Sequence, residues 1–251
     1  MKRIFLSAMM AIAFLPGIGA AQSFMPDLGR PAYGPRIRIT PFIGQAPSLS
    51  RLERWTVTGI GLPGGVNDYD VELASGPAAG VSLEVLVIDR LAFIGSVALV
   101  SRGGTREYSS TDAVFYNYGG SNFLLAKGAV ALRLNEQVSD LQVHSLTATI
   151  FAGPAYIREM PKSDASTPDM LQAAMVHWAV NVGANAEIPL GWDALSLQGG
   201  VEDYYTWWNN AEVARRNDAY NRTVNGLTTS TVVEADPSHM WLFRVGLSFR
   251  L

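Results

Sequence analysis

The 251-residue chain has no cysteine and only three histidines, so it is poor in the side chains that most often bind metals. The absence of cysteine excludes a disulfide framework and thiolate metal sites, and it suits a chain that crosses an oxidising compartment. The formal net charge of −3 argues against nucleic acid as a partner. No Walker loop, dinucleotide fingerprint or HExxH motif is present. The sequence therefore predicts no cofactor and no metal.

Long apolar runs are also missing, apart from the N-terminus. Lys2 and Arg3 precede a short apolar stretch, residues 4–18, and small residues follow at 19–21. This pattern predicts a secretory signal peptide over residues 1–21. The alternative, a membrane anchor, is disfavoured because the apolar stretch is short and Pro16 interrupts it. Cleavage would leave 17 basic and 22 acidic residues, a net charge of −5.

The last residues of the chain alternate strictly in character. Trp241, Phe243, Val245, Leu247, Phe249 and Leu251 share one parity, whereas Arg244, Gly246, Ser248 and Arg250 fall on the other. A period of two is typical of a β-strand with one apolar face. An apolar face beside an arginine-bearing face suits a strand with lipid outside and a polar lumen inside.

Eight segments show this kind of pattern, and their connections alternate in length. The expected strands are residues 36–44, 78–88, 91–102, 122–134, 145–158, 174–188, 195–208 and 239–251. The long connections are residues 45–77, 103–121, 159–173 and 209–238, and the short ones are 89–90, 135–144 and 189–194. Membrane barrels have long extracellular loops and short periplasmic turns. The sequence thus predicts an all-β, eight-stranded antiparallel up-and-down transmembrane β-barrel over residues 36–251, after a periplasmic lead-in at residues 22–35.

The polar parity of these strands supplies candidates for the barrel lumen. They are Arg36, Arg38, Glu84, Lys127, Arg133, His177, Glu187, Glu202, Arg244 and Arg250. An eight-stranded barrel is only wide enough for its own side chains, so we expect a closed, salt-bridged interior. The alternative is a narrow, cation-lined conduit. The segments 91–102 and 145–158 are apolar on both faces, and the pattern does not assign their inner face.

Aromatic residues gather near the expected strand ends. Trp192 lies in a short turn, and the loop-side residues are Tyr156, Trp178, Tyr204, Tyr205, Trp207, Trp208 and Trp241. Interfacial girdles of membrane barrels place aromatic side chains there. Ordinary core packing is the alternative.

The long connections supply the other candidates. Tyr108, Phe115, Tyr116 and Tyr118 lie among small polar residues, which is typical of a recognition surface, although packing on the barrel rim would suit them equally. Acidic residues at every second position of 67–72 could supply oxygen ligands to Ca²⁺, but a solvated acidic turn is favoured because the EF-hand glycine and distal glutamate are missing. Residues 210–220 favour a short helix.

The sequence contains no clear catalytic constellation. Each of His144 and His239 has a serine next to it in sequence, but neighbours on a strand point to opposite faces and form no ready dyad. His177 is expected in the lumen or at its rim. We therefore expect no catalytic residues and no enzyme, and a lipid A-modifying barrel enzyme remains the alternative.

The signal peptide, the eight segments, the loop asymmetry and the strand 241–251 together resemble small bacterial outer-membrane barrels of the OmpA transmembrane-domain, OmpX and opacity-protein type. The final strand resembles their C-terminal assembly signal, with Leu251 in place of the usual Phe. The resemblance implies an outer-membrane location in a Gram-negative cell envelope, and a structural, envelope-integrity or adhesin-like role carried by the loops. It also implies contact with outer-membrane lipid and lipopolysaccharide, and insertion by the barrel-assembly machinery.

Two other classes stay open. One is a porin-like narrow channel or small hydrophobic-ligand conduit, similar to OmpW, in which the apolar inner faces of 91–102 and 145–158 would line an open lumen. The other is a soluble lipocalin-like carrier, whose apolar face would point inward.

Overall fold

The structure is a computed structural model, and it describes residues 31–60, 66–88, 90–108, 120–134, 146–162, 174–192, 195–224, 226–234 and 238–251. In some strand segments it describes the backbone only. The expected signal peptide at residues 1–21 and residues 22–30 of the expected lead-in lie outside the described part of the chain.

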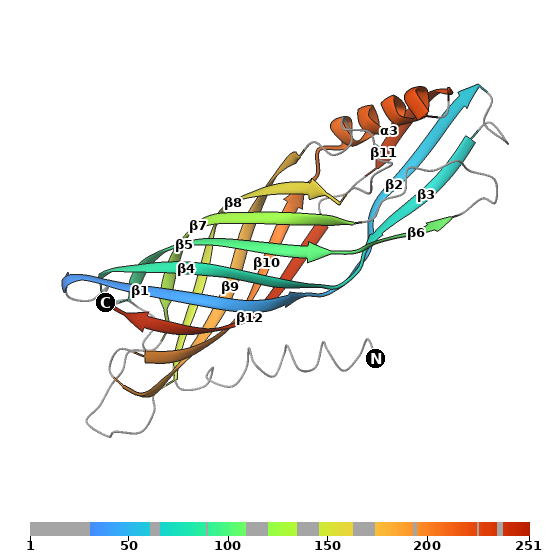
Figure 1. The fold of residues 1–251 in the computed structure, drawn as a ribbon. Helices are drawn as coiled ribbons and strands as arrows, with labels where there is room; N and C mark the ends of the chain where they lie inside the picture. Colours follow the sequence, from blue (N-terminus) through green and yellow to red (C-terminus); the bar gives the residue numbers. More distant parts are fainter. Residues whose placement is uncertain are drawn as a thin grey trace.

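Eight strands form a closed antiparallel barrel, as predicted (Figure 1). Around the barrel the order is β1-β12-β10-β9-β8-β7-β5-β4, with β4 next to β1. The strands are β1 (Pro31–Ala46), β4 (Gly76–Ile88), β5 (Leu91–Arg102), β7 (Ser121–Arg133), β8 (Thr147–Pro161), β9 (Met175–Trp192), β10 (Leu195–Trp207) and β12 (Ser238–Arg250). All eight expected segments are strands, although β1 begins at Pro31, inside the expected lead-in.

The apolar face of each strand points out of the barrel. In β5, Phe93 is 53% exposed and Val97 is also exposed, whereas Ala92, Ile94 and Ser96 between them are buried. β8 alternates in the same way, so the inner faces of both unassigned strands are now known. A soluble lipocalin-like carrier would have the opposite arrangement, and the structure therefore contradicts that alternative.

A second, four-stranded antiparallel sheet continues from one end of the barrel (Figure 1). Its strands are β2 (Leu49–Ile60), β3 (Val66–Leu73), β6 (Gly104–Tyr108) and β11 (Thr228–Glu234), in the order β11-β2-β3-β6. The helix α3 (Asn210–Val224) lies beside β11. We call these four strands and α3 the platform.

In the platform, four sequence-based expectations are wrong and one is confirmed. Residues 45–77, 103–121 and 209–238 were expected as loops, but each contains a strand of the platform. The acidic residues 67–72 lie within β3, so the expected acidic turn is wrong. The expected helix at 210–220 is confirmed as the first part of α3. The described residues include no helix with the length and apolar character that a membrane span requires.

The two ends of the barrel differ. At one end, β4 and β5 are joined through residues 89–90, β9 and β10 are joined through residues 193–194, and β12 ends; we call this the turn end. At the other end the chain enters the platform, and we call this the sheet end (Figure 1). Short turns at one end and long excursions at the other are typical of membrane barrels.

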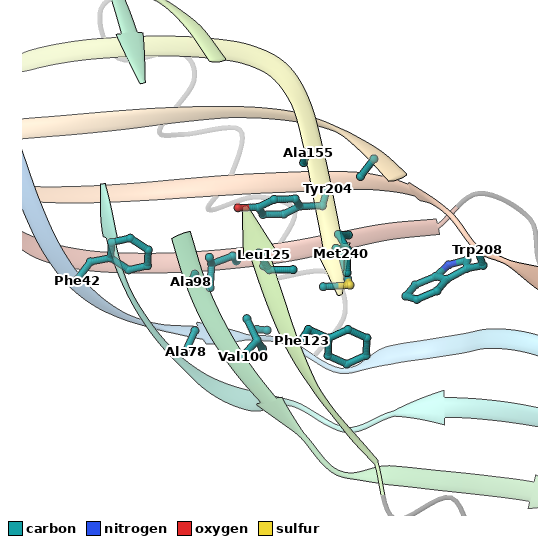
Figure 2. Packing of buried hydrophobic residues seen from close by; sticks show 14 residues of the cluster. Phe42, Ala78, Ala98, Val100, Phe123, Leu125, Ala155, Tyr204, Trp208 and Met240 are labelled. Atoms are coloured by element: carbon teal, nitrogen blue, oxygen red, sulfur yellow. The ribbon is translucent and has the colours of Figure 1, made fainter. Parts of the chain in front are cut away.

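Apolar side chains fill much of the interior (Figure 2). The larger cluster includes Phe42, Leu125, Ile157, Tyr204 and Trp208. The smaller cluster contains Leu86, Ala92, Ile94, Ala129, Ala131 and Phe151.

Candidate functional site

The centre of the barrel holds a group of three charged side chains. The carboxylate atom Oε1 of Glu202 lies 2.8 Å from Nζ of Lys127 and 2.7 Å from Nε of Arg244. The side chains of Lys127 and Glu202 have no exposed area. The strands β7 and β10 that carry these two residues are separated by β8 and β9, so the pair spans the lumen.

Hydrogen bonds complete this group. Tyr204 donates its hydroxyl to Oε2 of Glu202 at 2.7 Å, and Lys127 donates to Oδ1 of Asn181 at 3.1 Å. Arg244 donates to Oδ1 of Asn185 at 3.0 Å. Buried charges need such partners because removal from water is otherwise costly.

Aromatic rings close the sides of the same layer. Nζ of Lys127 lies 3.9 Å from the ring centre of Phe151, and the guanidinium of Arg244 lies 4.8 Å from that of Phe42. The layer is completed by residues with little exposed area from the remaining strands. One residue from each of the eight strands can be named in it: Phe42, Ser82, Ser96, Lys127, Phe151, Asn181, Glu202 and Arg244. We call these eight buried residues the central layer, and the side chains of Lys127 and Glu202 at its centre have no area that water can reach.

Toward the turn end, two further ion pairs lie in the interior. Arg38 pairs with Glu187, and Arg133 pairs with Glu84. Arg250, also expected in the lumen, is exposed at the end of β12. The backbone of Arg36 pairs with that of Leu86, and its side chain lies outside the described residues.

Toward the sheet end lies the larger apolar cluster, and next to it the described residues include a series of hydrogen-bonded side chains. Ser121 donates to Oε1 of Glu159 at 2.5 Å, and Oε2 of Glu159 lies 3.0 Å from Nε2 of His177. The backbone N–H of Asn209 donates to Nδ1 of His177 at 3.1 Å. That bond fixes the ring hydrogen on Nε2, so His177 donates to the carboxylate. The carboxylate of Glu159 stands between the serine and the histidine, so these contacts differ from a dyad in which the imidazole itself accepts from the hydroxyl.

The helix α3 is fastened to the edge of the platform sheet. The carboxylate of Asp218 accepts hydrogen bonds from the hydroxyl of Thr231 at 2.7 Å, from the hydroxyl of Thr229 at 2.9 Å and from the backbone N–H of Thr231 at 3.2 Å. Asn217 and Asn221 donate to the same two threonines. A strand edge left open would invite pairing with another chain, and these contacts cover the β11 edge.

The first turn of α3 carries its own ion pairs. Arg215 donates two hydrogen bonds to Glu212, and Arg216 donates one at 2.7 Å. The hydrogen bonds from Arg215, followed by the one from Arg216, lower the pKa of Glu212 to about 2. A carboxylate in the first turn also interacts favourably with the helix dipole.

Other sequence-based candidates divide between the described and undescribed parts. Phe115, Tyr116 and Tyr118 and the histidine His144 lie outside the described residues, as does the side chain of Tyr108 in β6. In β12, Val245, Leu247 and Phe249 are exposed on the outer wall, with Trp241 and Phe243 partly exposed; Leu251, just after the strand, is also exposed. No group of three metal-binding side chains occurs among the described residues.

Fewer of the loop-side aromatic residues face the outer wall than expected. Trp178, Tyr205 and Trp207 are exposed on the outer wall, but Tyr204 and Trp208 are buried in the interior. Tyr204 falls on the same parity as Glu202, which was the available signal for its inward position. The hydrogen-bonding roles of Asn181 and Asn185 were missed, because facing the lumen does not by itself identify a partner.

No family model matches the chain, and no curated protein matches it. Among solved structures, the outer membrane protein OprG from Pseudomonas aeruginosa matches with a TM-score of 0.58 at 10% identity, over 89% of this chain and 98% of that chain. Neisserial surface protein A (NspA) matches with a TM-score of 0.42 at 8% identity, over 87% and 99% of the two chains. Ail, the attachment invasion locus protein of Yersinia pestis, gives 0.37 at 11% identity, over 85% and 98%. The likeness to OprG establishes the fold of a small outer-membrane barrel, and the two lower scores add nothing further.

Proposed function

We propose that this protein is an integral outer-membrane barrel that presents the platform outside the cell as a binding surface, in a structural or adhesin-like role. The exposed apolar outer wall supports the membrane placement, because such a surface needs lipid around it. In this placement the turn end is periplasmic and the platform is extracellular. Residues 1–21 serve as a cleaved signal, β12 is read by the barrel-assembly machinery, and the wall contacts outer-membrane lipid and lipopolysaccharide.

The filled central layer is the observation that favours anchoring over transport. A conduit needs a continuous path for solute, but Lys127 and Glu202 have no exposed area and meet in mid-lumen. Their separation would leave the buried Lys127 ammonium without a counter-charge, which costs several kcal/mol. The interior therefore supports a rigid anchor.

The platform supports the binding role because it is a folded unit with a covered edge. On the face of β11 away from the Asp218 contacts, Thr228, Ser230 and Val232 are exposed, and Thr58 of β2 beside them is also exposed. Small hydroxyl-bearing and β-branched side chains make a flat surface with adaptable hydrogen-bonding groups. The function proposed is binding, with no catalytic step.

A second candidate is a hydrophobic-ligand conduit, and the apolar sheet-end half of the interior is the observation that favours it. Val100, Leu125 and Met240 line this half (Figure 2), and Ile157 belongs to the same buried cluster. A ligand that entered there would have to leave through the barrel wall, because the central layer blocks the path to the turn end.

Two measurements test the proposal. Purified protein in planar bilayers should show no conductance steps at neutral pH, and regular steps would overturn the closed interior. Cells that display the protein should then bind an array of immobilised glycans and extracellular-matrix proteins. Cells that display a barrel with residues 49–73 and 209–234 replaced by short Gly-Ser turns should lose this binding. Equal binding by both cell types would overturn the role of the platform.

A further inference from the structure

The outer wall of the barrel carries one carboxylate among its described strand residues, and this is Asp203 of β10. Asp203 lies between Glu202 and Tyr204, which point inward, and it shares its face with Tyr205 and Trp207. Its partners across the neighbouring strands are Trp241 and Val182. An ionisable group on a lipid-facing wall is costly, and it indicates a function by default.

Asp203 is bound to a histidine on the same wall. Its Oδ2 atom lies 2.6 Å from Nδ1 of His239 on β12. The Asp203 side chain is almost fully buried, with 8% of its area exposed, and its Oδ1 atom has no hydrogen-bond donor among the described residues. The site thus holds a buried carboxylate with unused hydrogen-bonding capacity.

Aromatic rings hold His239 in place. The ring of Trp241 stacks on that of His239, with 6.3 Å between the ring centres and 19° between the ring planes. The ring centre of Tyr205 lies 5.1 Å from that of His239. The His239 side chain remains 58% exposed. Because Nδ1 faces Asp203, Nε2 at the far edge of the ring is the atom available to a ligand.

The site lies near the upper boundary of the apolar wall. Asp203 is eight positions beyond Leu195, which lies at the turn end. With a rise of about 3.3 Å per residue and a strand tilt of about 40°, Asp203 lies about 20 Å farther along the barrel axis toward the sheet end. The apolar band of membrane barrels is about 25 Å tall. Trp178 and Trp207, which pair across β9 and β10, lie still farther toward the sheet end. Acyl chains surround the wall below this level, and lipid headgroups surround it above.

We propose that Asp203, His239, Tyr205 and Trp241 form a binding site for the phosphate of a lipid headgroup in the extracellular leaflet. In the bound state, Nε2 of His239 donates to a phosphate oxygen, while Nδ1 donates to Asp203, which orients the ring. Phosphate at a charge-assisted donor is a strong pairing where water is scarce. The phosphate belongs to lipid A or to a phospholipid, which share this chemistry.

The inference rests on the membrane placement proposed above, and heat-modifiable gel mobility of each sample tests that placement separately. His239→Phe keeps an aromatic ring and removes both nitrogens, and Asp203→Asn keeps the shape and removes the charge. Arg158→Gln is the matched control, because Arg158 is an exposed cation on the same wall outside the site. Bisphosphorylated lipid A, dephosphorylated lipid A, phosphatidylglycerol and phosphatidylcholine are titrated into each detergent-solubilised protein, and native mass spectrometry measures bound lipid.

We expect phosphate-bearing lipid to bind about tenfold more weakly to His239→Phe and to Asp203→Asn, and unchanged to Arg158→Gln. Dephosphorylated lipid A should bind the wild type as weakly as it binds His239→Phe. A preference for lipid A or for phosphatidylglycerol identifies the source of the phosphate. Equal binding by wild type and both site variants would overturn the proposal, and so would an equal loss in Arg158→Gln.

A measurement on the wild type alone guards against misfolded variants. With ¹⁵N-labelled histidine, the Nε2 signal of His239 should shift on addition of phosphorylated lipid A and stay in place with the dephosphorylated form. His177, buried in the interior, provides an internal reference. A His239 Nε2 signal that does not shift on addition of phosphorylated lipid A would overturn the proposed site.

Discussion

Replacement of Glu202 should destabilise the barrel more than replacement of Lys127, although the two form one ion pair. Glu202 is the single carboxylate between two cations, at 2.8 Å from Lys127 and 2.7 Å from Arg244. In Glu202→Gln both cations stay buried without a counter-charge. Removal of one partner from a buried pair costs about 3–5 kcal/mol.

Lys127→Met leaves a balanced pair behind. Glu202 keeps Arg244 and the Tyr204 hydroxyl, and the main loss is the hydrogen bond to Asn181. A lost buried hydrogen bond costs about 1–3 kcal/mol. The two variants should therefore differ by about 2 kcal/mol, which is about a 30-fold difference in the unfolding equilibrium constant.

Urea unfolding in lipid vesicles, followed by tryptophan fluorescence and by the gel shift between folded and unfolded bands, measures this difference. Glu202→Asp is the matched control, because it keeps the charge and shortens the side chain. The reasoning is refuted if Lys127→Met is as unstable as Glu202→Gln, since the asymmetry follows from the two-to-one ratio of cations to carboxylate.

Three further predictions concern the platform and the packing. Asp218→Ala should free α3 from β11 and raise trypsin cleavage after Arg215 with the barrel still folded, whereas unchanged cleavage would show that Asp218 does not hold the helix. The pKa of Glu212 lies below the value of about 4.5 for an unpaired glutamate, so the contribution of Glu212 to stability should be complete above pH 4.5 and disappear as the pH falls through about 2. NMR titration of the carboxyl carbon should show this midpoint, and Arg215→Gln should raise the midpoint. Gly183→Val would place a Cβ 2.4 Å from the Phe151 ring, so this overpacking should cost about 1–3 kcal/mol, and an unchanged thermal midpoint of the gel shift would contradict the packing.

The barrel was predictable because lipid imposes a simple rule on its strands. Every described outward position between Val81 and Val87 in β4 is apolar, and the residues between them include Ser82 and Glu84. A period of two is then visible in the sequence itself. Short connections such as residues 89–90 also predicted which neighbouring strands pair as hairpins.

The platform was not predictable by the same rule. Strand β11 reads Thr-Thr-Ser-Thr-Val-Val-Glu, with polar residues on both faces. One face packs against α3 through the hydroxyls of Thr229 and Thr231, so burial there involves hydrogen bonds and leaves no apolar alternation. The site on the outer wall was missed for a related reason. The partner of Asp203 depends on the register between β10 and β12, and no single strand reveals it.

We expect the pairing of the first and last strands of the barrel to set the order in which it folds. β1 and β12 are hydrogen-bonded neighbours, yet Arg38 and its partner Arg250 are more than 200 residues apart in the chain. The hairpin of β4 and β5 forms locally, whereas the seam between β1 and β12 must wait until the last strand arrives. Pro41 lies in this seam and has no N–H to donate, so the seam offers fewer bonds to hold an early encounter. Closure should therefore be the slow step of folding. A circular permutant that joins residue 251 to residue 31 and opens the chain at residues 193–194 would turn this seam into a local hairpin and move the slow step to the junction of β9 and β10.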